Sequence, residues 1–143
     1  MKKTFKTFVS LALILACLLG FASCKEEKTA TGLWANAIYA EDTELGKGAK
    51  TITVVIEAED KAVKFTVRTD KNTLGEALLE NELIDGEKGD YGIYIKSANG
   101  IVADYDVDQT YWAVYIGEEM AMTGVDSIEI TDGASYRLAR ETM

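Results

Sequence analysis

The sequence predicts an α+β domain in which a mixed β-sheet wraps around one helix, in the β-grasp arrangement. Three observations along the 143 residues lead to this fold class. Two stretches alternate apolar and polar residues as β-hairpins do, a stretch between them changes to helical spacing, and a "DG" turn precedes a final strand. Strands that surround a single amphipathic helix in this order are typical of β-grasp folds.

The first 23 residues have the organisation of a bacterial signal peptide. Three lysines precede a 14-residue apolar run, Phe8–Phe21, which is too short to span a membrane as a helix of about 20 residues. The letters "FASC" then place two small residues directly before Cys24, as at a lipoprotein cleavage site, although Phe21 stands where leucine is usual. We therefore expect residues 1–23 to be removed and Cys24 to be lipidated. Plain secretion, with Cys24 as a bystander, is the alternative.

The cysteine content agrees with a lipidated N-terminus. The only other cysteine, Cys17, leaves with the signal peptide, so the exported domain cannot form an internal disulfide. Lipidation of Cys24 accounts for the unpaired thiol, and two acyl chains hold a protein stably at a membrane. The sequence thus predicts an exported protein that is lipid-anchored to the outer face of the bacterial cell membrane, or to the outer membrane. Residues 24–31 would form a tether and residues 32–143 the domain.

Composition excludes several classes of function. Cleavage removes three of the 15 Lys and Arg and none of the 24 Asp and Glu, which leaves a net charge near −12. Such a surface repels nucleic acids and anionic lipid headgroups. Histidine is absent, so a Ser–His or Cys–His nucleophile and an imidazole metal ligand are excluded. Because no phosphate-binding glycine loop or spaced acid pair stands out either, we expect no enzyme and no covalently bound cofactor.

The first half of the domain supplies the first hairpin. Residues 33–40, "LWANAIYA", are expected to form an edge strand, followed by a loop over 41–50. Residues 51–56 and 63–68 alternate apolar and polar side chains on either side of a turn near 59–61. Strict alternation on both arms predicts a hairpin with one buried face.

One helix follows this hairpin. Thr73 and Glu76 fit a capping box, and apolar residues between Leu74 and Leu83 share one helical face. This face is expected to fill the concave side of the sheet. Gly86 is expected to end the segment.

A second hairpin turns at Asn99-Gly100, a pair that suits a type I′ turn. A two-residue loop would pair Ala98 with Ile101, Ser97 with Val102, and Tyr94 with Tyr105. The face expected to point to the core carries Ile93, Ile95 and Val102, and the opposite face carries Tyr94, Lys96, Ile101 and Tyr105.

A third strand pair is expected at 112–116 and 120–123, around Gly117. Trp112, Val114 and Ile116 would share a mostly buried face, because a tryptophan gains most from burial. The opposite, more open face would carry Tyr111, Ala113 and Tyr115. Met120 and Met122 would fill gaps in the core or, as the alternative, form a soft contact patch.

After a turn at Asp132-Gly133, the final strand is expected over Ala134–Arg140. The β-grasp order predicts that this strand pairs in parallel with the first arm of the first hairpin, residues 51–56.

Residues 50–140 resemble the transcobalamin-like C-terminal domain family, which also occurs in bacterial lipoproteins. Three blocks carry the resemblance: "TLGEALLE", "GIYIKSANGI", and "YWAVYI" followed by "GVDSIEITDGASYRL". It implies a β-grasp-like domain without catalysis, which in the animal proteins closes over one face of cobalamin against a separate helical domain. By position, the resemblance places five residues near the ligand: Tyr94, Lys96, Ser97, Tyr111 and Trp112.

The sequence departs from the animal pattern because it has no counterpart of the helical domain and no histidine to coordinate cobalt. A second binding protein would have to complete the site, or the ligand differs. The predicted aromatic faces add Tyr105 and Tyr115 to the candidate ligand-binding residues.

Two functions follow as hypotheses. The first is a membrane-anchored surface lipoprotein that binds a small molecule, cobalamin or a related corrinoid, and passes it to a vitamin transporter. The second is a non-enzymatic protein-interaction module in which the same tyrosines dock another surface protein.

A weak metal candidate is the run Asp104, Asp106 and Asp108. It lacks the glycine and glutamate of an EF-hand loop, since Gln109 and Tyr115 stand there. On extended chain, however, the three carboxylates would lie on one side, and a calcium site of another type stays open beside solvated turn carboxylates.

Overall fold

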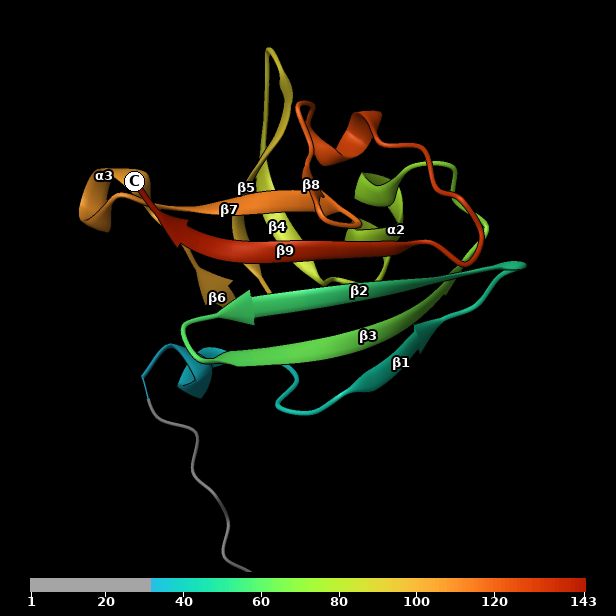
Figure 1. The fold of residues 1–143 in the computed structure, drawn as a ribbon, viewed down its shortest axis with the longest axis horizontal. Helices are drawn as coiled ribbons and strands as arrows, with labels where there is room; N and C mark the ends of the chain where they lie inside the picture. The colour runs from blue at the N-terminus through green and yellow to red at the C-terminus, as the bar shows by residue number, and fades with distance from the viewer. Residues whose placement is uncertain (1–31) are drawn as a thin grey trace, which may run out of the picture.

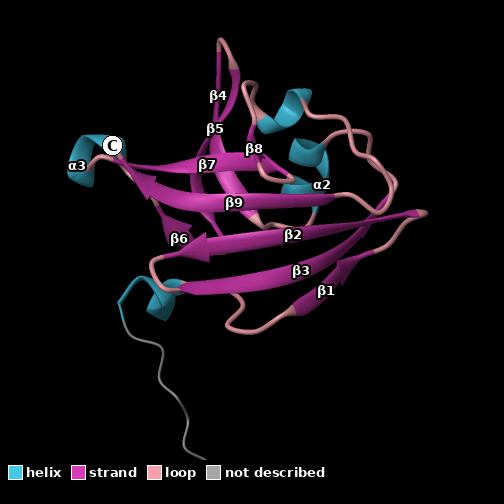
Figure 2. Cartoon of the chain, in the orientation of Figure 1, coloured by secondary structure: helices cyan, strands magenta, loops and turns pink. Residues whose placement is uncertain are grey.

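The computed structural model describes residues 32–143. The expected signal peptide, Cys24 and the tether lie outside the described residues. Within them the fold is mixed α+β, with most strands gathered into two sheets and only short helices (Figures 1 and 2). Along residues 32–143, none of the helices has the length and apolar character to cross a membrane.

The larger sheet has six strands in the order β1-β3-β2-β9-β7-β8. Their bounds are β1 Thr43–Gly46, β2 Lys50–Ala58, β3 Lys61–Thr69, β7 Thr110–Ile116, β8 Glu119–Met120 and β9 Ser135–Thr142. The smaller sheet has the order β4-β5-β6, with β4 Ile84–Gly89, β5 Gly92–Ala98 and β6 Ile101–Val102. The short helices are η1 Gly32–Asn36, α2 Leu74–Glu80, α3 Tyr105–Asp108 and η2 Val125–Ser127.

The final strand lies where the sequence predicted it. β9 pairs in parallel with β2, from Thr53 opposite Ser135 to Glu57 opposite Ala139. Its other edge pairs antiparallel with β7. The predicted parallel pairing is therefore confirmed, and it makes β9 the central strand that joins the first hairpin to β7.

The first hairpin is also confirmed. β2 and β3 pair antiparallel from Lys50 opposite Thr69 to Ala58 opposite Lys61, with Glu59 at a φ of 55° in the turn. Alternate residues of both arms are buried in the main core: Ile52, Val54, Ile56, Val63, Phe65 and Val67.

The helix forms at its predicted start but is shorter than expected. Thr73 and Glu76 make both bonds of the capping box, which confirms that prediction. The helix ends at Glu80, and Leu83 is buried beyond it as the chain enters β4. The expectation that Gly86 ends the segment was wrong. Gly86 lies inside β4 at a register shift, where a Cβ atom would come within 2.2 Å of the Tyr94 carbonyl oxygen.

The expected strand at 33–40 was also wrong. Residues 32–36 form η1 instead, and the edge strand is β1, inside the expected loop, paired in parallel with β3. The reason is the burial of Trp34, whose Nε1 donates a hydrogen bond to the Ala58 carbonyl at 3.0 Å. A compact turn places this indole under the first hairpin, with Lys61 Nζ 4.8 Å from the ring centroid.

The second hairpin has the predicted turn and the predicted pairs at its closed end. Asn99 and Gly100 have φ angles of 50° and 77°, and Ala98 and Ser97 pair with Ile101 and Val102. The burial prediction was wrong, since Ile101 is 1% exposed and Val102 is 57% exposed. The cause is η1 and the residues after it, which cover the Ile101 side of the hairpin. Tyr94 does not pair with Tyr105, because β6 ends at Val102 and α3 begins.

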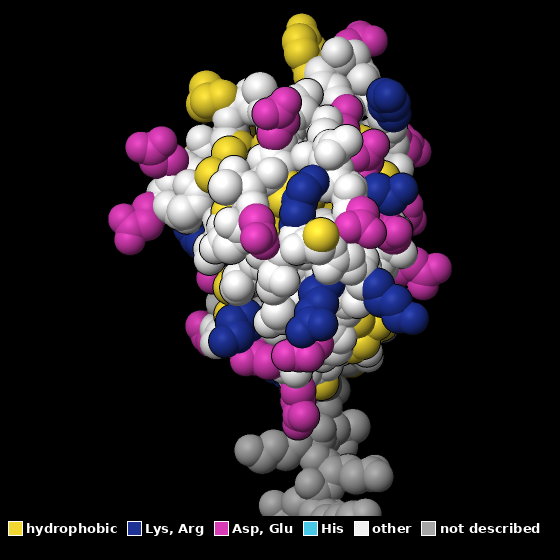
Figure 3. Space-filling view, turned by 90° about the vertical axis from the view of Figure 1, so that its right-hand side faces the viewer, with side chains coloured by type: hydrophobic (Ala, Val, Ile, Leu, Met, Phe, Trp, Pro, Cys, Tyr) yellow, Lys and Arg dark blue, Asp and Glu magenta, His cyan; other side chains and the backbone are white. Residues whose placement is uncertain are grey.

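Charge is spread over the surface on the side opposite α3. Figure 3 shows the face at the right of Figure 1, where acidic and basic side chains are interspersed and apolar side chains are scattered. Mixed charge of this kind suits a solvated surface. The candidate residues lie toward the other end of the molecule, near α3 and the β4–β5 hairpin (Figure 1).

Candidate functional site

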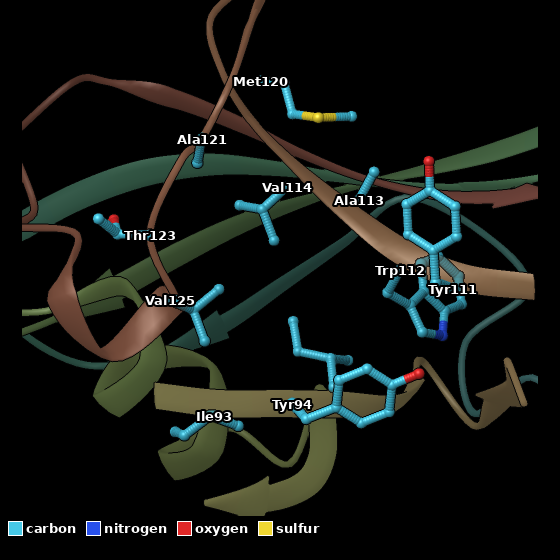
Figure 4. Close-up of a pocket in the computed structure, with 12 residues that line it drawn as sticks. Ile93, Tyr94, Tyr111, Trp112, Ala113, Val114, Met120, Ala121, Thr123 and Val125 are labelled. Atoms are coloured by element: carbon cyan, nitrogen blue, oxygen red, sulfur yellow. The ribbon is translucent and has the colours of Figure 1, made fainter. Parts of the chain in front are cut away.

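An apolar cavity, which we call the inner cleft, lies between β5 and β7. Its volume is about 230 Å³. Figure 4 shows side chains from both strands and from the segment after β8 pointing toward it. The lining residues are Ile93, Tyr94, Ile95, Tyr111, Trp112, Ala113, Val114, Met120, Ala121, Thr123, Gly124 and Val125. Few of these side chains carry polar groups, so the inner cleft suits apolar or aromatic contact.

A second hollow, the tyrosine groove, adjoins the inner cleft and shares Tyr94 and Tyr111 with it. Its volume is about 570 Å³, and its lining residues are Glu87, Tyr94, Lys96, Tyr105, Asp106, Tyr111 and Met143. A smaller recess of about 150 Å³ continues it beneath α3 and is also lined by Tyr94, Lys96, Tyr105 and Asp106. The tyrosine groove thus combines three aromatic rings with charged groups.

The structure brings most of the predicted site residues together. Tyr94 and Lys96 come from β5, Tyr105 from α3 and Tyr111 from β7, and all four line the tyrosine groove. Trp112 lines the inner cleft beside them. Two candidates lie elsewhere: Ser97 is half-buried within the β5–β6 hairpin and lines none of the hollows described here, and Tyr115 lies on the outer face of the large sheet.

Trp112 is both a core residue and a wall of the inner cleft. Its side chain is 7% exposed, and its Nε1 donates a hydrogen bond to the Ile101 carbonyl at 3.2 Å. Tyr111 and Tyr115 are half-buried on the opposite face, so the predicted division of β7 into two faces is confirmed for these residues. It was wrong for Ile116, which is 46% exposed, because β7 ends there and turns into the short hairpin with β8.

On the outer face, both tyrosines bond to one carboxylate. The Tyr111 and Tyr115 hydroxyls donate to the two oxygens of Glu141, at 3.1 and 2.6 Å. These hydrogen bonds raise the pKa of both phenols, because they favour the protonated form. The Arg137 guanidinium lies 3.9 Å from the Tyr115 ring centroid and pairs with Glu57. Tyr115 therefore belongs to a stabilising polar network on the sheet surface.

The charged groups of the tyrosine groove favour a cationic lysine. Lys96 Nζ lies 3.0 Å from a Glu87 carboxylate oxygen, across the β4–β5 hairpin. The hydrogen bond and charge of Glu87, with a smaller effect of Asp104, raise the pKa of Lys96. Both partners of this ion pair are exposed, so its contribution to stability is small. Its ammonium group remains a hydrogen-bond donor at the rim of the groove.

The three aspartates do not form the extended row that the sequence suggested. They lie around α3, a single turn, where Asp104 accepts a hydrogen bond from the Asp106 main-chain N–H at 3.0 Å. Asp108 bonds to Thr110 and, at 2.9 Å, to Arg140, and the Thr110 hydroxyl is the main cause of its lowered pKa. Between Gly32 and Met143, no three acidic or cysteine side chains gather as a metal site would require.

Met120 and Met122 lie at the surface, although the sequence pattern predicted them in the core. Met120 is 46% exposed and lines the inner cleft, and Met122 is 94% exposed, so their expected role as core residues was wrong. Met143 borders the tyrosine groove. The available sequence signal was Gly117, which has a positive φ in the turn after β7. Residues that follow such a turn at the edge of a sheet can be exposed, as Met120 and Met122 are.

The chain resembles one protein family in sequence and two solved structures in fold. A family described as a domain of unknown function, DUF4430, matches residues 71–135, which include α2, β4 to β8, the whole inner cleft and all of the tyrosine groove except Met143. No curated protein sequence matches the chain. Among solved structures, haptocorrin in complex with Cbi has a TM-score of 0.54 at 18% identity, and the match covers 65% of this chain. The chain spans only 25% of the haptocorrin chain, and at this identity the likeness shows a transcobalamin-like fold alone.

A second solved structure is more similar in sequence. It is a crystal structure of a proposed metal-binding protein from Ruminococcus gnavus ATCC 29149, with a TM-score of 0.63 and 33% identity. The match covers 66% of this chain and 99% of that one. With this identity over almost the whole length of its relative, the chain belongs to the same family as the Ruminococcus gnavus protein.

Proposed function

We propose that this protein captures a small planar molecule of the corrinoid class in the tyrosine groove. The observation that carries the proposal is the convergence of Tyr94, Tyr105 and Tyr111, from three different elements, on one hollow. Haptocorrin, which shares the fold, was solved with bound Cbi. We propose binding without catalysis, in which the polar groups of the groove serve as hydrogen-bond donors and acceptors.

The chemistry of the groove suits a ligand with a flat apolar body and a polar edge. Tyrosine rings contribute large apolar surfaces and keep their hydroxyls available for hydrogen bonds. Lys96 and Asp106 add a donor and an acceptor at the rim. A corrin ring with amide side chains has both features, whereas a purely apolar ligand would use the tyrosine rings alone.

The groove covers one side of such a ligand. Its large open volume, about 570 Å³, leaves the other side to be covered. We propose that a second binding protein or a vitamin transporter at the same membrane supplies that cover and receives the ligand. No covalent attachment of the ligand is proposed.

Titration calorimetry with cobalamin, cobinamide and haem tests the function. Binding of either corrinoid at micromolar concentration supports it. If none of the three ligands binds, the proposed function is wrong and the protein-interaction hypothesis is favoured.

Removal of single tyrosines should separate binding from stability. Tyr94→Ala is expected to leave the melting temperature nearly unchanged, because the side chain is about half exposed. It should weaken corrinoid binding about 3- to 30-fold, the loss expected for one stacking ring. Tyr111→Ala should behave alike, with a small additional loss of stability from its bond to Glu141.

Tyr91→Ala is the matched control, because Tyr91 is almost fully exposed at the tip of the β4–β5 hairpin and lines none of the hollows described here. Calorimetry and thermal melts of the three variants check the prediction. If Tyr91→Ala weakens binding as much as Tyr94→Ala, the ligand does not lie in the tyrosine groove.

The membrane anchor is a second part of the proposal. We propose that a lipid on Cys24 holds the protein at the outer face of the membrane. The described chain begins at η1, at the bottom of Figure 1, whereas the β4–β5 hairpin projects at the top. This arrangement would turn the tyrosine groove away from the membrane.

Cys24→Ser should prevent lipidation, so the variant is expected to stay in the aqueous phase, or to remain unprocessed, while the wild type partitions into detergent. Detergent phase separation followed by immunoblotting measures this. Partition of the Cys24→Ser variant into detergent would show that the lipoprotein assignment is wrong.

A further inference from the structure

The inner cleft separates two strands that do not pair with each other. β7 belongs to the six-stranded sheet and β5 to the three-stranded sheet. Consecutive residues of both strands, 93–95 and 111–114, line the cleft. Figure 4 shows the two ribbons passing on opposite sides of the lining side chains. The cleft is therefore bounded by strands that belong to different sheets.

Along β7, alternate residues direct their main-chain groups to opposite sides. The Gly117 N–H donates to the Ser135 carbonyl at 3.2 Å, which continues the ladder with β9, so the odd-numbered residues of β7 pair with β9. The Val114 carbonyl instead accepts from the Ala121 N–H at 2.7 Å, on the other side. Trp112, two residues earlier, therefore directs its N–H and C=O to this same side.

This side of β7 is an open edge over part of its length. Within residues 32–143, the strand that pairs there is β8, and its pairs involve only Tyr115 and Ile116. The chain then leaves the edge after the bond from Ala121. Among residues 32–143, the N–H and C=O of Trp112 and the N–H of Val114 have no strand partner. Unpaired groups in a row at a strand edge are a template for another strand.

β5, across the cleft, offers no matching edge to a bound chain. β6 is only two residues long, and the last bond on its side is from the Ala103 N–H to the Lys96 carbonyl, at 2.9 Å. At Tyr94 this edge is not available, because the register with β4 shifts between Asp85 and Gly86 and the Tyr94 carbonyl oxygen points to Gly86 of β4. A chain in the cleft therefore has its main-chain partners on β7.

We propose that the inner cleft binds an extended peptide segment of another protein, by strand addition to β7. The unpaired N–H, C=O and N–H of Trp112 and Val114 alternate as an antiparallel partner strand requires. The apolar walls accept alternate side chains of such a segment. Strand addition goes beyond the proposed function, because it uses a different hollow and a different class of partner.

Charge defines the flanks of the segment. Glu118 and Glu119 adjoin Met120 at one end of the cleft, and Glu87 lies beside Tyr94 in the adjoining tyrosine groove. Because the domain is strongly acidic, lysine or arginine on either side of the apolar stretch would be attracted. The partner segment is therefore extended, apolar at alternate positions, free of proline at donor positions, and basic at its ends.

The capped peptide acetyl-KVTVTVK-amide has this chemistry and serves as the probe. At saturating peptide, amide hydrogen exchange measured by NMR is expected to slow at Trp112 and Val114 by about tenfold or more, the effect of about 1.4 kcal/mol of protection. Exchange at Ala113 should not change, because its N–H already bonds to β9. In the free protein, Trp112 should exchange faster than Ala113.

Two controls separate strand addition from general stickiness. Two analogues of the peptide carry N-methyl groups on alternate amides, so that one loses the N–H donors that face β7 and the other loses the donors that face away from it. The first analogue should bind at least about tenfold more weakly than the second. Thr123→Trp should block the cleft, since Thr123 is exposed and lines it, whereas Met122→Trp should not, since Met122 is exposed and lies outside the lining.

No binding at millimolar peptide, equal binding of both methylated analogues, or slow exchange of Trp112 in the free protein would overturn the proposal. Cobinamide binding is measured on the same samples. Cobinamide binding tests the proposed function separately, because Thr123 does not line the tyrosine groove and Thr123→Trp leaves that groove in place.

Discussion

Replacing Trp112 with alanine is expected to lower the free energy of unfolding by about 3–5 kcal/mol, the range for removing a large aromatic side chain from a core. Three features of the site place it in this range. The indole is 7% exposed, it lies in the main core cluster, and its Nε1 bonds to the Ile101 carbonyl. Without the indole, the Ile101 carbonyl loses this bond and the wall of the inner cleft collapses or fills with water.

Urea titration and thermal melts followed by circular dichroism measure the loss. Trp112→Phe is the matched variant, because it keeps an aromatic ring and loses the hydrogen bond, so it should be destabilised less than Trp112→Ala. If Trp112→Ala melts like the wild type while Tyr94→Ala or Tyr111→Ala collapses, then the two faces of β7 have been assigned the wrong way round.

Local sequence patterns predicted the elements whose signals are complete within a few residues. The alternation in β2 and β3, the capping box at Thr73 and the Asn99-Gly100 turn each depend on neighbours in the chain. The parallel position of β9 could be predicted because few topologies accommodate hairpins, one helix and a closing strand. These features account for the neighbouring strands β3, β2 and β9 of the large sheet.

Elements held by distant contacts could not be predicted. Residues 33–40 resemble a strand in composition, yet they form η1 and an irregular segment because Trp34 is buried under the first hairpin, 24 residues away. The same segment reverses the burial of Ile101 and Val102. β4 was missed because two glycines and several charged residues give it no alternating pattern.

The candidate site was predicted in part, for a similar reason. Strand alternation and the family resemblance both pointed to Tyr94, and the structure places it between the two hollows. Tyr115 was predicted from strand alternation alone, and it bonds to Glu141 on the outer face. The positions of α3 and of the β4–β5 hairpin beside β7 decide which tyrosines border a hollow. Contacts between residues far apart in the sequence set these positions, so local patterns could not predict them.

Asn99→Ala is expected to be about as damaging as the loss of Trp112, although Asn99 is a turn residue. Its side chain is fully buried and accepts from the Tyr39 N–H at 2.9 Å while donating to the Tyr39 carbonyl at 2.8 Å. Alanine would leave both main-chain groups of Tyr39 without partners, at about 1–3 kcal/mol each. An alanine at a φ of 50° costs about 1 kcal/mol more. Because both bonds to Tyr39 are only part-buried, each costs toward the lower end of that range, and we expect a total loss of about 3–5 kcal/mol.

Asn99→Gly separates the two causes of this loss. Glycine tolerates the positive φ but makes no side-chain bonds, so it should be less destabilised than Asn99→Ala by about 1 kcal/mol. Both variants should also loosen the segment that carries Trp34, because the Ile38 N–H and both main-chain groups of Tyr39 bond to Asn99. In a Trp112→Phe background, Trp34 is the remaining tryptophan, and its emission should shift to the red at lower urea than the main unfolding transition. Two results would contradict this role of Asn99 in holding the N-terminal segment against the second hairpin. One is a single unfolding transition with no earlier change in Trp34 emission. The other is a decrease in the free energy of unfolding of less than about 1 kcal/mol in Asn99→Ala.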